Sequence, residues 1–264
     1  MVGECQLQKN MKKKSKLVLG QVDFINCYPI NIPFEKEFKP EYIKTINATP
    51  KELNKLVLNK KIDAGPVSSY FYLKNKDKLS RFGNLCIASN GPADSVLLFS
   101  KYKIKDLNKR LVTLSKTSAT SNELLKILCK HFIKIKPVFK AKKDKQSDAY
   151  LLIGDAALQK SKQNKKLYVY DLGTLWKKYT GLPMVFAVWV YRNETKNKHL
   201  QKLVDLLQES KQKGLGKHKK LIIQKAQTKL PQKIGFYKTY FKNLKYDFDR
   251  NCQKGLKKFE SLCD

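Results

Sequence analysis

The sequence has no long hydrophobic run, few arginines, few histidines and no closely spaced pair of cysteines. Its longest uninterrupted apolar segment, Met184–Tyr191, has eight residues, whereas a membrane-spanning helix needs about 20. The apolar stretch that follows the lysines at 12–14 is interrupted by Gln21 and Asp23, too early for the core of an export signal. We therefore expect a cytoplasmic protein without membrane insertion, and a flexible tail over residues 1–16.

The six cysteines and three histidines lie far apart along the chain, without any Cys-x-x-Cys pair. This spacing disfavours a zinc site, and we expect no metal. Single cysteines in a cytosolic chain are usually small buried hydrophobic residues. The glycine-rich phosphate loops and the Gly-x-Ser-x-Gly elbow are also missing, which disfavours nucleotide chemistry of those types and serine hydrolysis.

Basic residues outnumber acidic ones by 55 to 22, which gives a formal charge of +33. Only four of the 55 are arginine, although base readout and bidentate phosphate contacts favour arginine. The charge therefore indicates a lysine bias of composition and no specific nucleic-acid partner. It is uneven, at +3 over residues 17–97, +14 over 98–187 and +12 over 188–264. A positive field of this kind steers small anions towards the protein.

Strand and helix patterns alternate through the first two thirds of the chain, which predicts an α/β protein with mostly parallel sheets. Thr49-Pro50-Lys51-Glu52 has the form of a capping box at a helix start, and Thr120 with Glu123 fits a second one. Beyond residue 198 we expect only helices, over 199–212, 217–229, 236–247 and 252–262. Two long apolar strands, 95–100 and 184–191, bracket the middle third. They predict two lobes with a cleft between them: lobe 1 from residues 17–97 plus 188–264, and lobe 2 from residues 98–187.

Short polar residues follow the predicted strands, and in open α/β sheets ligands bind at that edge. These residues are Asn26, Ser68, Ser69, Ser95, the segment 117–121, and Gly154 with Asp155. Two of the segments open helices, whose free N–H groups favour an anion. The pattern indicates a cleft that binds a small, carboxylate-rich molecule through neutral donors. Each residue taken alone is more typical of a helix cap or a turn.

Six segments in chain order carry a resemblance to a known family. They are Phe24–Pro29, Ile62–Tyr70, Cys86–Ser100, Thr117–Ser121, Leu151–Leu158 and Tyr170–Trp189. Together they resemble the chorismate dehydratase family of the futalosine route to menaquinone. The departures are small: Cys27 stands where the family often has Thr, Met184 stands where it often has Phe, and Ala93-Asp94 is an unusual pair before Ser95.

The resemblance implies a two-lobed type 2 periplasmic-binding-protein-like fold with an all-helical C-terminal tail. It also implies the cofactor-free dehydration of chorismate to 3-[(1-carboxyvinyl)oxy]benzoate. On this hypothesis the catalytic residues are Asn26 and Ser95, and the substrate-binding residues are Ser68, Ser69, Thr120, Ser121, Gly154 and Asp155. The only carboxylate among them, Asp155, lies near a helix start, which disfavours proton uptake. We therefore expect the enolpyruvyl carboxylate of the substrate to accept the proton, with Asp155 as the alternative base.

Two further functions compete with this hypothesis. One is the sister dihydroxynaphthoate synthase of the same pathway, which has a similar fold and is usually described with an active-site histidine. The other is a cytoplasmic protein of the same fold that binds a small carboxylate without catalysis. Non-specific nucleic-acid binding would show itself by an affinity that falls steeply with salt. The oligomeric state does not follow from the sequence.

Overall fold

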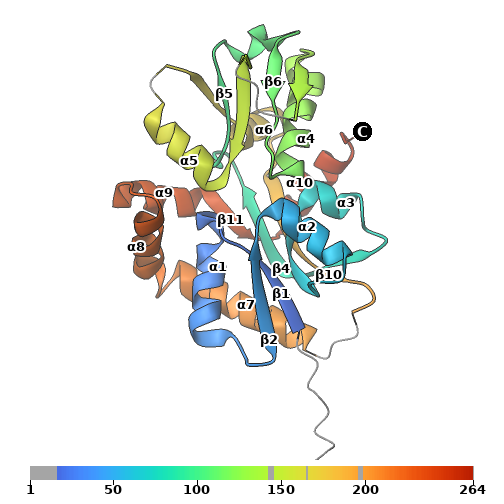
Figure 1. Ribbon diagram of the computed structural model, residues 1–264, viewed down its shortest axis with the longest axis vertical. Coiled ribbons are helices and arrows are strands. Elements are labelled where there is room, and N and C mark those ends of the chain that lie inside the picture. Colours follow the sequence, from blue (N-terminus) through green and yellow to red (C-terminus); the bar gives the residue numbers. More distant parts are fainter. Residues whose placement is uncertain (1–16, 142–145, 165, 196–198, 264) are drawn as a thin grey trace, which may run out of the picture.

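Two β-sheets, one in each lobe, form the framework of the protein (Figure 1). The computed structural model describes residues 17–141, 146–164, 166–195 and 199–263. The tail predicted over residues 1–16 lies outside these ranges. Sheet A consists, in spatial order, of β11 (Leu244–Asp247), β4 (Leu79–Ser89), β10 (Met184–Arg192), β3 (Ala64–Ser68), β1 (Leu17–Val22) and β2 (Ile43–Ala48). Sheet B consists of β7 (Val138–Lys140), β6 (Leu111–Thr113), β8 (Ala149–Ile153), β5 (Val96–Ser100) and β9 (Tyr168–Asp171).

Both sheets are mixed rather than mostly parallel. The neighbours β1, β2 and β3 run parallel, as do β6, β7 and β8. The strands next to the crossings between the lobes, β4, β10 and β5, pair antiparallel with their neighbours. The strands and helices alternate as predicted, but the prediction of mostly parallel sheets is wrong. The antiparallel pairs arise where the chain passes between the lobes. The precise boundaries at 97/98 and 187/188 stay a prediction.

Helices cover the faces of both sheets (Figure 1). The α-helices are α1 (Tyr28–Pro33), α2 (Pro50–Leu58), α3 (Ser69–Leu73), α4 (Ala119–Ile127), α5 (Gly154–Gln163), α6 (Leu172–Thr180), α7 (Leu200–Leu215), α8 (Lys219–Lys229), α9 (Ile234–Asn243) and α10 (Arg250–Glu260). Shorter helical turns are η1 (Ile25–Cys27), η2 (Phe34–Phe38), η3 (Ile104–Leu107) and η4 (Leu128–Ile133). Within the described residues, none of the helices is long and apolar enough to cross a membrane.

One predicted helix cap is confirmed and the other is wrong. At the start of α2, the Thr49 hydroxyl accepts a bond from the Glu52 N–H, and the Glu52 carboxylate accepts one from the Thr49 N–H at 2.9 Å. This is the predicted capping box. At the start of α4, however, Ser118 rather than Thr120 is the cap, because its hydroxyl accepts from the Ser121 N–H at 3.1 Å.

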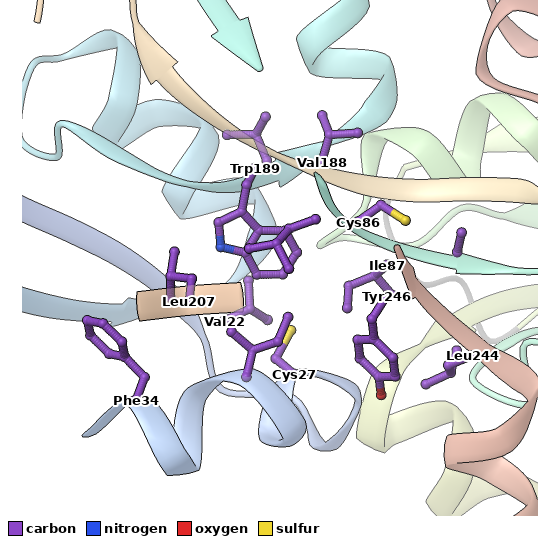
Figure 2. Packing of buried hydrophobic residues seen from close by; sticks show 14 of the residues in the cluster. Val22, Cys27, Phe34, Cys86, Ile87, Val188, Trp189, Leu207, Leu244 and Tyr246 are labelled. Carbon is purple, nitrogen blue, oxygen red and sulfur yellow. The ribbon is translucent and has the colours of Figure 1, made fainter. Parts of the chain in front are cut away.

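Each sheet has its own hydrophobic core. The larger core lies around sheet A and includes Trp189, which is 2% exposed. Figure 2 shows its indole pointing from β10 towards Leu207 of α7 and Val22 of β1. The core around sheet B contains Trp176, whose buried indole N–H donates to the Pro183 carbonyl at 3.1 Å. That bond removes the cost of burying an unpaired donor.

The C-terminal tail connects the two lobes. Its helix α10 places Cys252 and Leu256 in the core of sheet A and Phe259 in the core of sheet B. The tail is helical except for β11, where the helix predicted over 236–247 ends at Asn243. Leu244 and Tyr246 are buried, and Lys245 and Asp247 are not. This period of two allows the segment to form the edge strand beside β4.

Candidate active site

A cavity lies between the two sheets and receives residues from both lobes. Its empty space, with the open solvent at its mouth included, is about 650 Å³. Its polar side chains, apart from the thiol of Cys27, are those of Asn26, Ser68, Ser95, Ser118 and Ser121. Within the described residues, no charged side chain lines it. The cavity therefore offers hydrogen bonds from neutral groups in mostly apolar surroundings.

Asn26 occupies η1, directly after the end of β1. Its side-chain Oδ1 is buried and has no hydrogen-bond partner among the described residues. Its backbone carbonyl accepts a bond from the Tyr246 hydroxyl at 2.9 Å, which holds the loop from the β11 side. A buried amide oxygen without a partner is costly unless a ligand satisfies it. Asn26 is therefore placed to bind a ligand in the cavity.

Ser95 follows a tight turn that is fixed by Asp171. The backbone N–H groups of Ala93 and Asp94 donate to the Asp171 carboxylate at 3.0 and 2.7 Å. Asp94 has a positive φ of 56°, in the left-handed region that a non-glycine residue rarely adopts. Burial raises the pKa of Asp171, although these N–H groups act in the opposite direction. These backbone bonds to Asp171 thus fix the turn in front of Ser95.

Ser68 lies at the end of β3 and is paired with Asn54 of α2. The Asn54 amide donates to the Ser68 hydroxyl at 3.1 Å, and its Oδ1 accepts from the Ser68 N–H at 3.3 Å. A serine hydroxyl has one proton and two lone pairs. Because Asn54 occupies a lone pair only, the Ser68 proton is available for a ligand.

Two serines meet the cavity at the start of α4. The Ser118 hydroxyl accepts from the Ser121 N–H and donates to the Ser121 hydroxyl at 2.9 Å. Ser121 was predicted as a site residue, whereas Ser118 was missed because the cap was assigned to Thr120. The run of short residues at 117–121 already indicated a helix cap in this segment, because each hydroxyl in the run can cap a helix.

The other predicted site residues lie beside the cavity rather than on its wall, except for Gly154. Gly154 lines it with a backbone at φ +60°, where a Cβ would lie 3.0 Å from the ring of Phe24. The Thr120 hydroxyl accepts from the Tyr70 N–H at 3.0 Å, and Ser69 is fully buried. The Asp155 carboxylate binds the Ile25 N–H at 3.1 Å and Lys229 Nζ at 3.1 Å.

Cys27 also lines the cavity, next to Asn26. Burial, reinforced by the charges of Asp155 and Asp23, raises the pKa of its thiol to about 12. The thiol is therefore protonated at neutral pH and is a poor nucleophile.

The fold and the cavity between its lobes define a class, the two-lobed proteins with the periplasmic-binding-protein fold. A crystal structure of a protein from Archaeoglobus fulgidus has a TM-score of 0.76 to this chain, at 16% identity, covering 94% of this chain and 96% of that one. The periplasmic aliphatic sulphonate binding protein SsuA of Escherichia coli has a TM-score of 0.62, at 14% identity, covering 94% and 86%. At such identities the likeness shows the fold alone.

Sequence comparison adds the family. The sequence profile described as "Menaquinone biosynthesis" matches residues 17–264. The chorismate dehydratase of Thermus thermophilus is 32% identical over 266 residues, covering 92% of this chain and 93% of that protein. The chorismate dehydratase of Campylobacter jejuni is 31% identical over 179 residues, covering 65% and 66%. The chain belongs to the chorismate dehydratase family of menaquinone biosynthesis, which confirms the resemblance found in its motifs.

Proposed function

We propose that the cavity removes water from chorismate to give 3-[(1-carboxyvinyl)oxy]benzoate, without a cofactor and in the cytoplasm. The family relationship supports the hydro-lyase reaction. One observation supports the assignment of residues: Asn26 and Ser95 line the same cavity. The amide oxygen of Asn26 has no partner among the described residues, and none of their charged side chains lines this cavity. The product ring is aromatic, so the elimination is strongly downhill, and positioning with electrostatic stabilisation is what the protein has to supply.

The proton acceptor in this proposal is the substrate. Among the described residues, no carboxylate or histidine lines the cavity, and Asp155 is engaged with Ile25 and Lys229. The enolpyruvyl carboxylate takes the proton from the ring carbon as the C–O bond to the ring hydroxyl breaks. The electron pair of the C–H bond becomes part of the aromatic ring. The departing hydroxide then receives the proton from the enolpyruvyl acid and leaves as water.

The protein groups orient the two reacting parts of the substrate. Ser95 donates a hydrogen bond to the departing oxygen, where negative charge develops. Asn26 orients the ring and its hydroxyl. The hydroxyls of Ser68 and Ser121, together with backbone N–H groups at the start of α4, hold the two carboxylates. Thr120 supports this edge from behind through the bond from the Tyr70 N–H, and Ser69 is buried beside it. Gly154 allows the ring of Phe24 to lie against its backbone at the cavity wall.

The test is the turnover of chorismate by Asn26→Ala and Ser95→Ala. Each variant should lose about 10²–10³-fold in kcat, the effect of removing one preorganised hydrogen-bonding group. Asn84→Ala and Ser161→Ala, at exposed positions, are the matched controls and should keep the parent rate. Full turnover by either cavity variant would overturn its assignment.

The two competing functions give different results. None of the three histidines, all of which the structure describes, lines the cavity, and this argues against the histidine-dependent sister reaction. A binding protein without catalysis would be stabilised by chorismate and return it unchanged. Nucleic-acid affinity that disappears at moderate salt would reflect only the +33 charge.

A further inference from the structure

Helix α9 of the C-terminal tail contacts the turn before β5 through two side chains. The Tyr240 hydroxyl donates to Ser95 Oγ at 3.0 Å, and the Asn243 amide donates to Asp94 Oδ2 at 2.8 Å. Tyr240 is 1% exposed, and it does not line the cavity. We propose that Tyr240 is a positioning residue, which directs the Ser95 proton towards the departing oxygen of the substrate. The inference rests on the proposed role of Ser95.

A serine hydroxyl can make only a few hydrogen bonds, and this number determines where the Ser95 proton points. Ser95 has one proton to donate and two lone pairs to accept with. Tyr240 occupies one lone pair, so the Ser95 proton points elsewhere. In the structure it is directed to the Ala93 carbonyl at 3.2 Å, which is long for an O–H···O bond. A substrate oxygen at normal distance would replace that bond. A hydroxyl that accepts a hydrogen bond is also a stronger donor.

The tyrosine has the chemistry for a permanent donor. Burial raises the pKa of Tyr240 well above its usual value, so the phenol keeps its proton across the working range of pH. Its ring is stacked on Phe236, with centroids 5.9 Å apart, and contacts Phe241 at 5.5 Å. These ring contacts do not involve the hydroxyl. Removing the hydroxyl therefore leaves most of the packing in place.

The same helix contains a matched control. Tyr237 is also fully buried on α9, and its hydroxyl donates to the backbone carbonyls of Ala226 and Leu230 at 3.1 and 2.5 Å. Those bonds join α9 to α8 and the residue after it, and neither of them involves Ser95. Tyr237→Phe therefore tests the loss of a buried hydroxyl from this helix without the loss of a bond to the site.

The experiment compares kcat and KM for chorismate in Tyr240→Phe, Tyr237→Phe, Ser95→Ala and the double variant Ser95→Ala/Tyr240→Phe. Tyr240→Phe should lower kcat about tenfold, the effect of one weakened hydrogen bond in the transition state, with little change in KM. Tyr237→Phe should lower Tm and keep kcat. In the Ser95→Ala background, Tyr240→Phe should cause no further loss, because its partner is already missing.

Two results would overturn the inference: an unchanged kcat in Tyr240→Phe, or losses that simply multiply in the double variant. If Ser95→Ala itself keeps full turnover, the proposed function of Ser95 fails first. If Ser95→Ala is impaired and Tyr240→Phe is not, only the role of Tyr240 fails. Should Tyr240→Phe not fold, 3,5-difluorotyrosine at position 240 replaces it. This more acidic phenol keeps the ring and should raise kcat, and an unchanged kcat contradicts the proposal.

Discussion

The Asp155 carboxylate accepts a hydrogen bond from the backbone N–H of Ile25 at 3.1 Å, although 130 positions separate the two residues. Asp155 lies in the first turn of α5 in the lobe around sheet B, and Ile25 precedes Asn26 in η1, which follows β1. The second carboxylate oxygen binds Lys229 Nζ at 3.1 Å, and Lys229 in turn binds Asp23 at 3.0 Å. These contacts connect the two lobes beside the cavity.

We predict that Asp155→Asn raises KM for chorismate severalfold and changes kcat little. The amide oxygen of asparagine can still accept from the Ile25 N–H, so the variant removes mainly the ion pair with Lys229. Lys229→Met should raise KM at least as much, because it also loses the bond to Asp23, and the double variant should be no worse than Lys229→Met, because the ion pair with Asp155 is absent from both. Steady-state kinetics at one fixed ionic strength measures this.

The same variant separates this role from that of a base. If Asp155→Asn abolished turnover while chorismate still bound, Asp155 would be the proton acceptor and substrate assistance would be wrong. Lys229→Arg is the control, because it keeps the positive charge. If Lys229→Arg retains the parent KM, the change in Lys229→Met comes from the loss of charge alone.

The contribution of Lys229 to stability should persist until strongly alkaline pH. Burial acts to lower the pKa of Lys229, but its bonds to Asp23 and Asp155 outweigh burial, so the pKa lies above the usual 10.5. A raised pKa in the folded state gives stability that is fully present below the unfolded value and lost as pH rises through the folded value. The Tm difference between the parent and Lys229→Met should therefore be constant from about pH 7 to about pH 9. A difference that vanishes within this range would contradict the assignment.

Cys27 should be chemically inert despite its place in the cavity. With a pKa of about 12, less than about one thiol in a thousand is ionised at pH 8, and thiolate is the reactive form. We expect iodoacetamide to modify the partly exposed Cys263 well before Cys27, as peptide mapping by mass spectrometry would show. Cys27→Ala should keep kcat within about threefold. Rapid alkylation of Cys27 with loss of turnover would give the thiol a role that its burial argues against.

Gly214 allows α7 to lie against the first turn of α1. A Cβ at this position would lie 1.9 Å from the Pro29 carbonyl oxygen, so Gly214→Ala has to move one backbone segment. We predict a loss of about 1–3 kcal/mol in the free energy of unfolding, the usual cost of overpacking. Gly235→Ala in α9 is the control, because nothing lies within 4 Å of its Cβ. Equal unfolding midpoints in urea for the two variants would show that this close approach is not maintained in solution.

The local part of the structure could be predicted from the sequence, and the long-range part could not. The capping box at Thr49 and the placement of Asn26 and Ser68 after or at the end of a strand depend on neighbours in the chain, which patterns report well. Ser95 was expected to follow a strand, but it precedes β5. The bond from Tyr240 to Ser95 joins residues 145 positions apart, and no local pattern indicates it. The edge strand β11 was missed because four residues directly after a helix are too few to show a period of two.

The reaction of the purified protein with chorismate, in the absence of any cofactor, tests the proposed function most directly. Products are followed by mass spectrometry and ultraviolet absorbance. We predict a benzoate that is lighter than chorismate by one water, formed catalytically and lost in Ser95→Ala. Chorismate returned unchanged by a folded protein, whose Tm nevertheless rises in its presence, would contradict the assignment and identify a binding protein with this fold.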